Sequence, residues 1–472
     1  MRSSYDVDQV RAAEEPLLKA LPDGTLMQRA ATALARRCAA LLGNVYGARV
    51  VVLAGRGNNG GDAILAGTQL ARRGARVDVV HTTETVNSEE LQRLFDAADL
   101  VIDGMVGIGG SGGLRKEAAA VAGLLAAANA VVVAVDVPSG VDASTGEVAG
   151  VAVRADVTVT FGALKTGLVV APGADYAGTV EVVDIGLSLP DSDVTLLDAA
   201  DVARLLPAPA GETDKYRRGV LGVVAGSDEY TGAAVLAVGG ALGAGAGMVR
   251  FAGVAHPAEL VRQHWPEAVV TVVAPGDGAA VLDAGHVQAW VVGSGLGTDD
   301  AAAELVRAVL SSDLPVLLDA DAITVIGEHR DWLRSRTAPT VLTPHAGEFA
   351  RLTGIARDEV EARRLTLART AARDLEATVL LKGSTTIVAD PSGAVRINTA
   401  DTPYLATAGS GDVLSGICGA LLAGGLAPLD AASAGAFLHG MSGLSAASMP
   451  AAPLHALDLV THLPAAIRTV RD

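Results

Sequence analysis

Glycine-rich segments that carry a carboxylate combine groups able to bind phosphate with groups able to move protons. The segment Gly55-Arg56-Gly57-Asn58-Asn59-Gly60-Gly61-Asp62 follows an apolar run and opens an apolar-periodic stretch, which predicts a strand-to-helix turn. Its glycines let a ligand approach the backbone, and the free amides of a helix N-terminus favour a phosphate. Its Asn and Asp side chains add hydrogen bonds that a plain pyrophosphate turn does not need. The alternative is a tight turn capped by its own polar side chains.

Two more strand ends carry oxygen-rich loops, 103–113 and Asp136-Val137-Pro138-Ser139-Gly140-Val141-Asp142. The carboxyl ends of strands in an open parallel sheet share one edge, so all three loops are expected at one crevice. Oxygen atoms of Asn59, Asp103 and Ser139 could then bind a hard cation. A single aspartate at a strand end is more often a helix cap, and it is the convergence of three that favours a site.

Lysine is scarce in this chain, which holds only Lys19, Lys116, Lys165, Lys215 and Lys382. Lys165 follows a fourth strand, in Phe161-Gly162-Ala163-Leu164-Lys165-Thr166-Gly167. Asp136 with Lys165 nearby would form a proton-transfer pair, because the cation keeps the carboxylate ionised or stabilises developing negative charge. The alternative is a solvated surface lysine.

The second half carries a different set of loops. The strongest is Ala408-Gly409-Ser410-Gly411-Asp412-Val413-Leu414-Ser415-Gly416, whose amides at a helix start would form an anion hole for a phosphoryl group. Asp412 could take the proton of a substrate hydroxyl there, although a capped turn is the simpler interpretation. Lys382-Gly383-Ser384-Thr385-Thr386 offers an ammonium, hydroxyls and amides to phosphate oxygens. His345 lies in another strand-end loop, 343–348, and 292–297 is a strand followed by a glycine turn.

The elements that must position these loops are β-branched runs separated by helical stretches, which predicts βαβ units with mostly parallel sheets. In the first half the expected strands are Val50–Ala54, Val77–His81, Leu100–Asp103, Val131–Asp136, Val157–Phe161 and Val180–Ile185. In the second half they are Val220–Ala225, Trp290–Val292, Val316–Asp319, Val341–Thr343 and Val379–Lys382. The two series share no motif, and 206–212 has the composition of a linker. We expect two different α/β domains, 1–206 and 207–472.

Bulk composition agrees with this organisation. The chain has 472 residues, half of them apolar, with 55 glycines and few aromatics, which suits α/β layers. Its formal charge of −17 argues against nucleic acid and anionic membranes as partners. Cys38 and Cys418 lack metal-ligand spacing and are expected to be buried and reduced. With no signal peptide or membrane span visible, we expect a cytoplasmic protein.

The first-half motifs resemble the NAD(P)H-hydrate epimerase family over about residues 5–186. The resemblance implies a Rossmann-like domain in which Asn59, Asp103 and Ser139 bind potassium and Asp136, with Lys165, acts at the reactive nicotinamide. It assigns contacts with the hydrated dinucleotide to Asn58, Asn59, Gly60, Gly61, Asp62, Gly107, Ile108, Gly109, Gly110, Ser111, Gly112, Gly113 and Asp136. One departure is Ala63, where the family pattern usually has glycine.

The second-half motifs resemble ribokinase-like proteins, and within them the nucleotide-dependent NAD(P)H-hydrate dehydratases, from about Asp214 to Leu463. This implies a ribokinase-like α/β domain in which Asp412 is the catalytic base. Hydrate contacts are implied for Ala233, Gly295, His345 and Asp412, and nucleotide contacts for Lys382, Gly383, Ser384, Thr385, Thr386 and Gly411. Ser294 and Ala346 replace family prolines, Ser410 replaces a threonine and Asp214 replaces a histidine.

Together the resemblances imply a bifunctional repair enzyme that epimerises R and S NAD(P)H hydrate and dehydrates the S form at the expense of ADP or ATP, with magnesium. A stereospecific dehydratase alone would strand one epimer, which gives a chemical reason for the fusion. The implied partners are hydrated NADH or NADPH and an adenine nucleotide, in a homo-oligomer. Two alternatives remain: a ribokinase-like vitamin or sugar kinase, or a first domain that serves as a non-catalytic binding scaffold.

Overall fold

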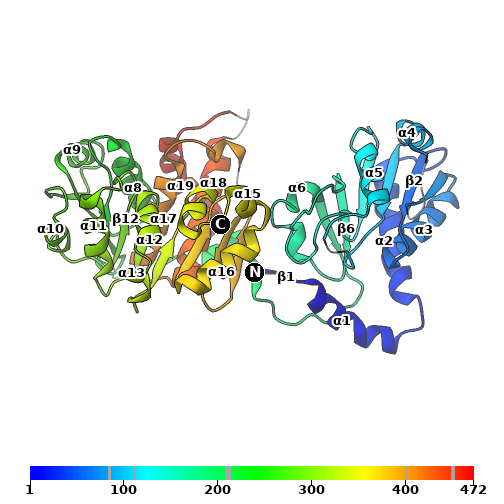
Figure 1. Ribbon diagram of the computed structural model, residues 1–472, viewed down its shortest axis with the longest axis horizontal. Helices are drawn as coiled ribbons and strands as arrows, with labels where there is room; N and C mark the ends of the chain where they lie inside the picture. The colour runs from blue at the N-terminus through cyan, green and yellow to red at the C-terminus, as the bar shows by residue number, and fades with distance from the viewer. Residues whose placement is uncertain (83–86, 111, 208–213, 400–401, 448–451) are drawn as a thin grey trace. The chain divides into compact units, whose positions relative to one another are not determined.

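The computed structural model describes residues 1–82, 87–110, 112–207, 214–399, 402–447 and 452–472 (Figure 1). The chain separates into two compact units. The N-terminal unit comprises Ser3–Val194 with Glu361–Leu365, and the C-terminal unit comprises Met1–Arg2, Thr195–Val360 and Thr366–Asp472. The boundary between residues 206 and 207 stays a prediction about the two functional domains, and most of the expected linker lies outside the described residues.

The N-terminal unit is built on a six-stranded sheet in the order β3-β2-β4-β5-β6-β7, and every neighbouring pair is parallel. Its strands are β2 (Arg49–Ala54), β3 (Arg76–His81), β4 (Leu100–Gly104), β5 (Val131–Val135), β6 (Val157–Phe161) and β7 (Thr179–Val183). Its helices are α1 (Val7–Ala20), α2 (Thr25–Leu42), α3 (Asn58–Ala71), α4 (Ser88–Ala97), α5 (Lys116–Leu125), η1 (Thr166–Leu168) and α6 (Ala174–Ala177). All six strands predicted for the first half are present, so the parallel α/β prediction is confirmed.

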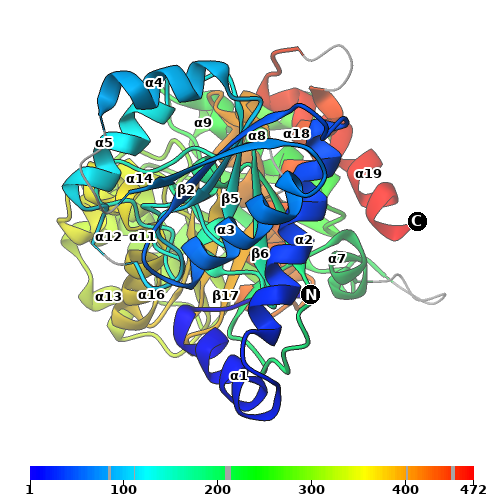
Figure 2. The same ribbon diagram turned by 90° about the vertical axis from the view of Figure 1, so that its right-hand side faces the viewer.

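Alternate residues of these strands supply two separate cores, because successive strand side chains point to opposite faces. Val50 and Val52 of β2 pack with α2 and α3, whereas Val51 and Leu53 pack with α4 and α5. The sheet is therefore covered by helices on both faces, a three-layer arrangement (Figure 2). Strands buried on both faces read as continuous apolar runs, which is the pattern that predicted them.

The C-terminal unit contains the larger sheet, in the order β1-β8-β17-β16-β15-β14-β13-β12-β9-β10-β11. Neighbouring strands from β15 to β11 are parallel, and β16 pairs antiparallel with β15 and β17. The strands are β1 (Arg2–Ser4), β8 (Val194–Leu196), β9 (Val220–Val224), β10 (Met248–Gly253), β11 (Val269–Val272), β12 (Ala289–Val292), β13 (Val316–Leu318), β14 (Thr340–Leu342), β15 (Thr378–Leu381), β16 (Thr386–Ala389) and β17 (Val395–Asn398). The sequence analysis predicted β9 and β12 to β15 and missed the others, several of which are short or partly exposed edge strands.

Helices surround this sheet, and α8 and α17 pack closely against one another. The helices are α7 (Ala199–Leu205), α8 (Thr231–Gly243), α9 (Ala255–His264), α10 (Gly278–Leu282), α11 (Asp300–Leu310), α12 (Asp321–Glu328), α13 (Asp331–Arg334), α14 (Ala346–Thr353), α15 (Arg357–Ala362), α16 (Arg364–Leu375), η2 (Pro403–Leu405), α17 (Ser410–Ala423), α18 (Pro428–Ala446) and α19 (Ala456–Arg471). A Cβ atom at Gly240 would lie 2.3 Å from the Val413 carbonyl oxygen, and one at Gly416 would lie 2.0 Å from that of Ala237. Glycine is required at both positions for the two helices to approach, so small residues on α8 serve packing.

Two further expectations concern burial. Cys38 and Cys418 are free thiols with no exposed surface, as predicted. Within the parts of the chain that the structure describes, no helix has both the length and the hydropathy needed to cross a bilayer. The apolar stretch 118–135 is divided between α5 and β5.

Candidate active sites

In the N-terminal unit the loops that follow β2 and β4 touch directly. The Gly55 amide donates to the Gly104 carbonyl at 3.0 Å, and a Cβ atom at Gly55 would lie 1.9 Å from the Met105 carbonyl oxygen. A Cβ atom at Gly104 would lie 2.5 Å from the Cβ atom of Ala63. The alanine that departs from the family pattern therefore packs its methyl group against a glycine, and it takes no polar group from the loop.

The three oxygen donors predicted for a cation converge on residues 103–107. Ser139 donates to the Asp103 carboxylate through its hydroxyl at 2.6 Å and its amide at 2.8 Å. The Val106 amide donates to Ser139 Oγ at 2.9 Å. A Cβ atom at Gly107 would lie 2.4 Å from Asn59 Oδ1, so the asparagine lies against the same loop. Asp103 is fully buried, and that burial raises the pKa of its carboxyl to about 6.

The predicted juxtaposition of Asp136 and Lys165 is present, as a buried ion pair. Lys165 is 1 % exposed, and its Nζ donates to Asp136 Oδ1 at 2.6 Å and to the Phe161 carbonyl at 2.7 Å. Asp136 Oδ1 also accepts from the Thr160 hydroxyl at 2.9 Å and the Phe161 amide at 3.2 Å. The surface-lysine alternative is wrong at this position, because the ammonium lies in the protein interior.

Asp136 holds an unusual backbone conformation, with φ of 67°. A non-glycine residue in that region is strained, and such residues gather at functional sites. Its side chain is aimed at Lys165 by this turn directly after β5. The roles of both residues in chemistry remain predictions.

The glycine-rich loop after β4 folds back on itself, with the Gly110 amide donating to the Gly107 carbonyl at 2.9 Å. Gly113 has φ of 91°, and a Cβ atom there would lie 2.4 Å from the Ala149 carbonyl oxygen. Ile108 receives a hydrogen bond on its carbonyl from Arg11 at 3.5 Å. Ser111 lies outside the described residues, and the predicted dinucleotide contacts of this loop remain predictions.

In the C-terminal unit a residue that the sequence analysis did not single out lies at the centre of the site. Asp319 directly follows β13 and is 1 % exposed. Its carboxylate accepts from Lys382 Nζ at 2.9 Å, from the Ser415 hydroxyl at 2.7 Å and from two further hydroxyls. Those two are Thr343 Oγ1 at 2.8 Å and Ser294 Oγ at 3.3 Å. Lys382 and these hydroxyls hold the pKa of Asp319 below its usual value despite its burial.

Lys382 therefore points beneath the loop that begins α17. Its ammonium lies 3.7 Å from Glu348 Oε2, and 3.2 Å from where a Cβ atom would stand at Gly411. The carboxylates of Asp319 and Glu348 therefore interact with the same ammonium group that would contact a phosphate bound at this loop. Gly383 and Ser384 are exposed and Thr385 is buried. Glu348 belongs to the strand-end loop 343–348, but its spacing in the sequence does not predict that its carboxylate lies near the Lys382 ammonium.

Asp412 stands in the first turn of α17, whose N-cap Gly409 has φ of 84°. Burial raises the pKa of Asp412 to about 7, with a second contribution from the negative charge of Asp319. A carboxyl poised near neutrality is suited to proton transfer. The loop is also fastened from behind, because His439 Nε2 lies 2.9 Å from the Ser410 carbonyl oxygen. Burial lowers the pKa of His439 to about 4, so the neutral ring donates this hydrogen bond.

His345 serves as the N-cap of α14, a structural role that the sequence did not predict. Its Nδ1 accepts from the amides of Gly347 at 2.9 Å and Glu348 at 3.2 Å. Burial lowers the pKa of His345, in keeping with a neutral ring that accepts through Nδ1. Ala233 and Gly295, the other predicted hydrate contacts, lie together: a Cβ atom at Gly295 would be 2.8 Å from that of Ala233.

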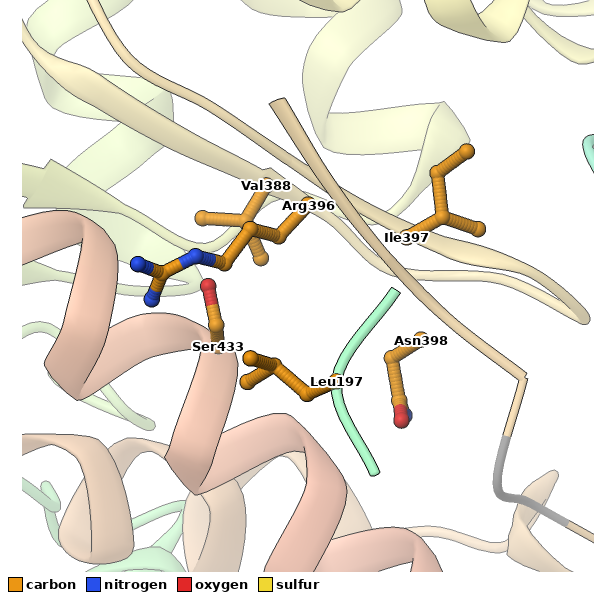
Figure 3. A pocket seen from close by; sticks show the side chains of 6 residues that line it. All are labelled: Leu197, Val388, Arg396, Ile397, Asn398 and Ser433. Carbon is orange, nitrogen blue, oxygen red and sulfur yellow. The ribbon is translucent and has the colours of Figure 1, made fainter. Parts of the chain in front are cut away.

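A small pocket beside β17 is unrelated to these groups. Figure 3 shows its lining by Leu197, Val388, Arg396, Ile397, Asn398 and Ser433. No predicted site residue borders it. Both candidate sites instead lie at the carboxyl ends of parallel strands, where ligands bind in open α/β sheets.

Comparisons with known proteins cover both units. A family model described as NAD(P)H-hydrate dehydratase matches residues 221–465. A second, described as YjeF-related protein N-terminus, matches residues 23–94 and 80–167. The chain is 50 % identical over 449 residues to the bifunctional NAD(P)H-hydrate repair enzyme Nnr of Mycobacterium tuberculosis (strain CDC 1551 / Oshkosh), covering 92 % of each chain. It is 47 % identical over 486 residues to the enzyme of the same name from Mycobacterium leprae, covering 99 % of each.

Among solved structures, the chain is similar to the ADP/ATP-dependent NAD(P)H-hydrate dehydratase of Bacillus subtilis, co-crystallized with ATP/Mg2+. The identity is 30 % and the TM-score 0.54, and the match covers 59 % of this chain and 99 % of that one. A ribokinase-like superfamily protein from Enterococcus faecalis is similar in fold, with a TM-score of 0.54 and 22 % identity. The ribokinase-like expectation for the second half is therefore confirmed.

Proposed function

The chain belongs to the family of bifunctional NAD(P)H-hydrate repair enzymes, and from that premise we propose how its two units divide the repair. The N-terminal unit interconverts the R and S forms of NAD(P)H hydrate, and the C-terminal unit dehydrates the S form at the expense of ADP or ATP. The observation that carries the proposal is the pair of preorganised carboxyl centres, Asp136 with Lys165 and Asp412 above Asp319. Similarity to named relatives over both halves favours this function over a vitamin kinase with an accessory scaffold.

The chemistry of the hydrate defines what each unit must do. Water adds to an enamine double bond with its hydroxyl on the carbon bonded to nitrogen, which creates a stereocentre. Interconversion of the two epimers requires proton transfer to and from the oxygen atom bonded to that carbon, and Asp136 is the group that we place there. The Lys165 ammonium orients the carboxylate and offsets its charge.

In the C-terminal unit Asp412 accepts the proton of the substrate hydroxyl as its oxygen attacks the terminal phosphorus of the nucleotide. Phosphate is a better leaving group than hydroxide, and the ring double bond is restored when phosphate leaves and the neighbouring ring carbon loses a proton. Amides at the start of α17, with Lys382 beneath them, stabilise the charge of the transferred group. Magnesium would be held mainly by nucleotide phosphates and water and would offset their charge, and we assign no side chain to it.

The oxygen cluster of the N-terminal unit fits potassium. Asn59, Asp103 and Ser139 offer hard oxygen donors, and the Val106 carbonyl joins them, lying 3.2 Å from Ser139 Oγ. We propose that the three side chains hold the ion. When bound it would supply positive charge that offsets the phosphates of the dinucleotide.

One experiment tests the division of labour. The purified protein is incubated with mixed epimers of NADH hydrate and with ADP or ATP, and the absorbance of the restored dihydropyridine is followed. Complete conversion of both epimers is expected. Turnover of nucleotide with a vitamin or sugar alcohol, and none with the hydrate, would overturn the proposal.

A further inference from the structure

One carboxyl oxygen of Asp62 is buried and has no hydrogen-bond donor in the part of the chain that the structure describes. Asp62 lies in the first turn of α3, is 7 % exposed, and its Oδ1 has no partner among the residues that the structure describes. The other two buried aspartates of this site, Asp103 and Asp136, each accept three hydrogen bonds. Burying an ionised carboxylate without donors is costly, so such a group either holds a proton or awaits a ligand.

The backbone places Asp62 beside the reacting end of β5. Asn59 Nδ2 donates to the Val135 carbonyl at 2.6 Å, which fastens the first turn of α3 to the residue before Asp136. From the other side, a Cβ atom at Gly61 would lie 3.1 Å from Met27 Cε, so α2 covers the turn with an apolar side chain. The turn that carries Asp62 is therefore fixed beside the end of β5 and covered by an apolar side chain.

The charged groups around Asp62 come from three other segments. Burial, followed by the charges of Asp136 and Glu14, raises the pKa of Asp62 to about 7. Glu14, on α1, has a raised pKa through its own burial, while Lys165 and Arg11 act to lower it. The carboxyl groups of Asp62, Glu14 and Asp136 thus lie close enough to influence one another, and of the three Asp136 is the one that pairs directly with the Lys165 ammonium. Electrostatics favours a proton on one of the remaining two, and Asp62 is the more buried.

We infer that Asp62 is a second catalytic residue of the N-terminal unit, the proton donor that works opposite Asp136. The inference rests on the proposed epimerase function and adds a mechanism to it. Where two carboxyl groups lie in surroundings that favour different protonation states, one can act as the acid and the other as the base. Here Asp136 is held by an ammonium, and one oxygen of Asp62 has no donor within the described residues.

The reaction then proceeds by exchange of the hydroxyl. Asp62 gives its proton to the hydroxyl oxygen of the hydrate, the carbon–oxygen bond breaks, and water leaves. The lone pair of the adjacent ring nitrogen forms a carbon–nitrogen double bond, giving an iminium cation. A second water adds to the opposite face of that carbon while Asp136 accepts its proton, and the electron pair returns to nitrogen.

After one turnover Asp136 holds the proton and Asp62 is ionised. This is the arrangement required for the reverse direction. A site that interconverts two epimers needs this exchangeable pair, with one proton between the two carboxyl groups. That one-proton state is lost as Asp62 ionises, so epimerisation is expected to slow as pH rises through about 7.

The first test measures epimerisation and its pH profile in Asp62→Asn and in Asp96→Asn, an exposed aspartate of α4. Asp62→Asn should lower kcat by about 10²–10⁴-fold, the range for loss of a general acid, with KM nearly unchanged. Asp62→Glu should restore part of the rate together with the alkaline decline. If wild type epimerises and Asp62→Asn keeps its rate, the inference is overturned while the proposed function stands. If wild type does not epimerise, the proposed function fails.

A second test addresses the charge network and the exchanged oxygen. Glu14→Gln removes a like charge, so the alkaline decline should move to lower pH, and Glu15→Gln on the exposed side of α1 should leave it in place. In ¹⁸O-labelled water each epimerisation should introduce one labelled oxygen above the uncatalysed background. Epimerisation without incorporation of label would overturn the exchange route. If the loss of rate at alkaline pH occurs at the same pH in Glu14→Gln as in wild type, the assignment of that loss to ionisation of Asp62 is overturned.

Discussion

Lys382 Nζ lies 2.9 Å from Asp319 Oδ1, in the interior of the C-terminal unit and beneath the loop that starts α17. Lys382, which its sequence motif predicts to bind phosphate, is thus held by Asp319, which belongs to none of the motifs recognised in the sequence. Fixing the ammonium in advance removes the entropy cost of ordering it when a nucleotide binds. The pair also ties Asp412 to Asp319, because the negative charge of one raises the pKa of the other.

Asp319→Asn should shift the pH dependence of dehydration. Asp412 acts as a base when ionised, so wild-type activity should rise as pH increases through about 7. Removing the Asp319 charge lowers the pKa of Asp412, which moves this rise to lower pH. The maximal rate should also fall, because Lys382 loses its closest partner. Initial rates of dihydropyridine formation between pH 5 and 9 measure both effects, with Asp300→Asn on the exposed start of α11 as the control. If the rise in dehydration rate stays at the same pH in Asp319→Asn, the charge of Asp319 does not influence the ionisation of Asp412.

Lys382→Ala should weaken nucleotide binding and leave epimerisation intact, since the two sites belong to different units. It should also lower stability, because Asp319 and Glu348 are left buried without their cation. Breaking a buried pair costs on the order of 3–5 kcal/mol. Calorimetry with ADP and thermal unfolding measure the two effects. Unchanged nucleotide affinity would move the phosphate site elsewhere, and 227–233 would be the next candidate.

Asp412→Asn keeps the size of the side chain and removes the proton acceptor. Dehydration should fall on the order of 10²–10⁴-fold, while nucleotide affinity changes little. Single-turnover assays with the S epimer measure the first quantity and calorimetry the second. Near-normal dehydration would rule out this residue as the base.

Much of this arrangement could be predicted from sequence because it is local. Strands buried on both faces are continuous apolar runs, and glycine with aspartate after such a run predicts a strand-end loop. The pairing of Asp136 with Lys165 followed from two loops at one sheet edge. The role of Asp319 could not be predicted in the same way, because its four donors come from four separate segments of the chain. Glu14 also carried no signal, since only the packing of α1 brings it to the site.

His345 was predicted from the sequence as a site residue, and the structure adds a structural role that the sequence did not predict. The resemblance to the dehydratases implies a contact with the hydrate, and the structure shows that the residue is also the N-cap of α14. The two roles use different nitrogens, because Nδ1 accepts from backbone amides. Contact with the hydrate through the other ring nitrogen remains a prediction.

The last prediction separates an active N-terminal unit from a binding scaffold. Asp136→Asn removes the carboxylate that Lys165, Thr160 and Phe161 orient, so epimerisation should be lost while the C-terminal unit still dehydrates the S epimer. With mixed epimers and excess nucleotide, product should form in a fast phase that consumes the S form. A slow phase at the uncatalysed rate of epimerisation should follow, whereas wild type should show a single fast phase.

Potassium provides the matched comparison for this experiment. Ser139→Ala removes a hydroxyl of the proposed ion site and leaves the Asp136 carboxylate in place, so its rate of epimerisation should respond less to added potassium chloride than that of wild type. Sodium chloride at equal concentration controls for ionic strength. If Asp136→Asn consumes both epimers as fast as wild type, catalysed epimerisation does not depend on this carboxylate. If wild type itself shows the slow phase at the uncatalysed rate, the scaffold interpretation of the first domain is favoured.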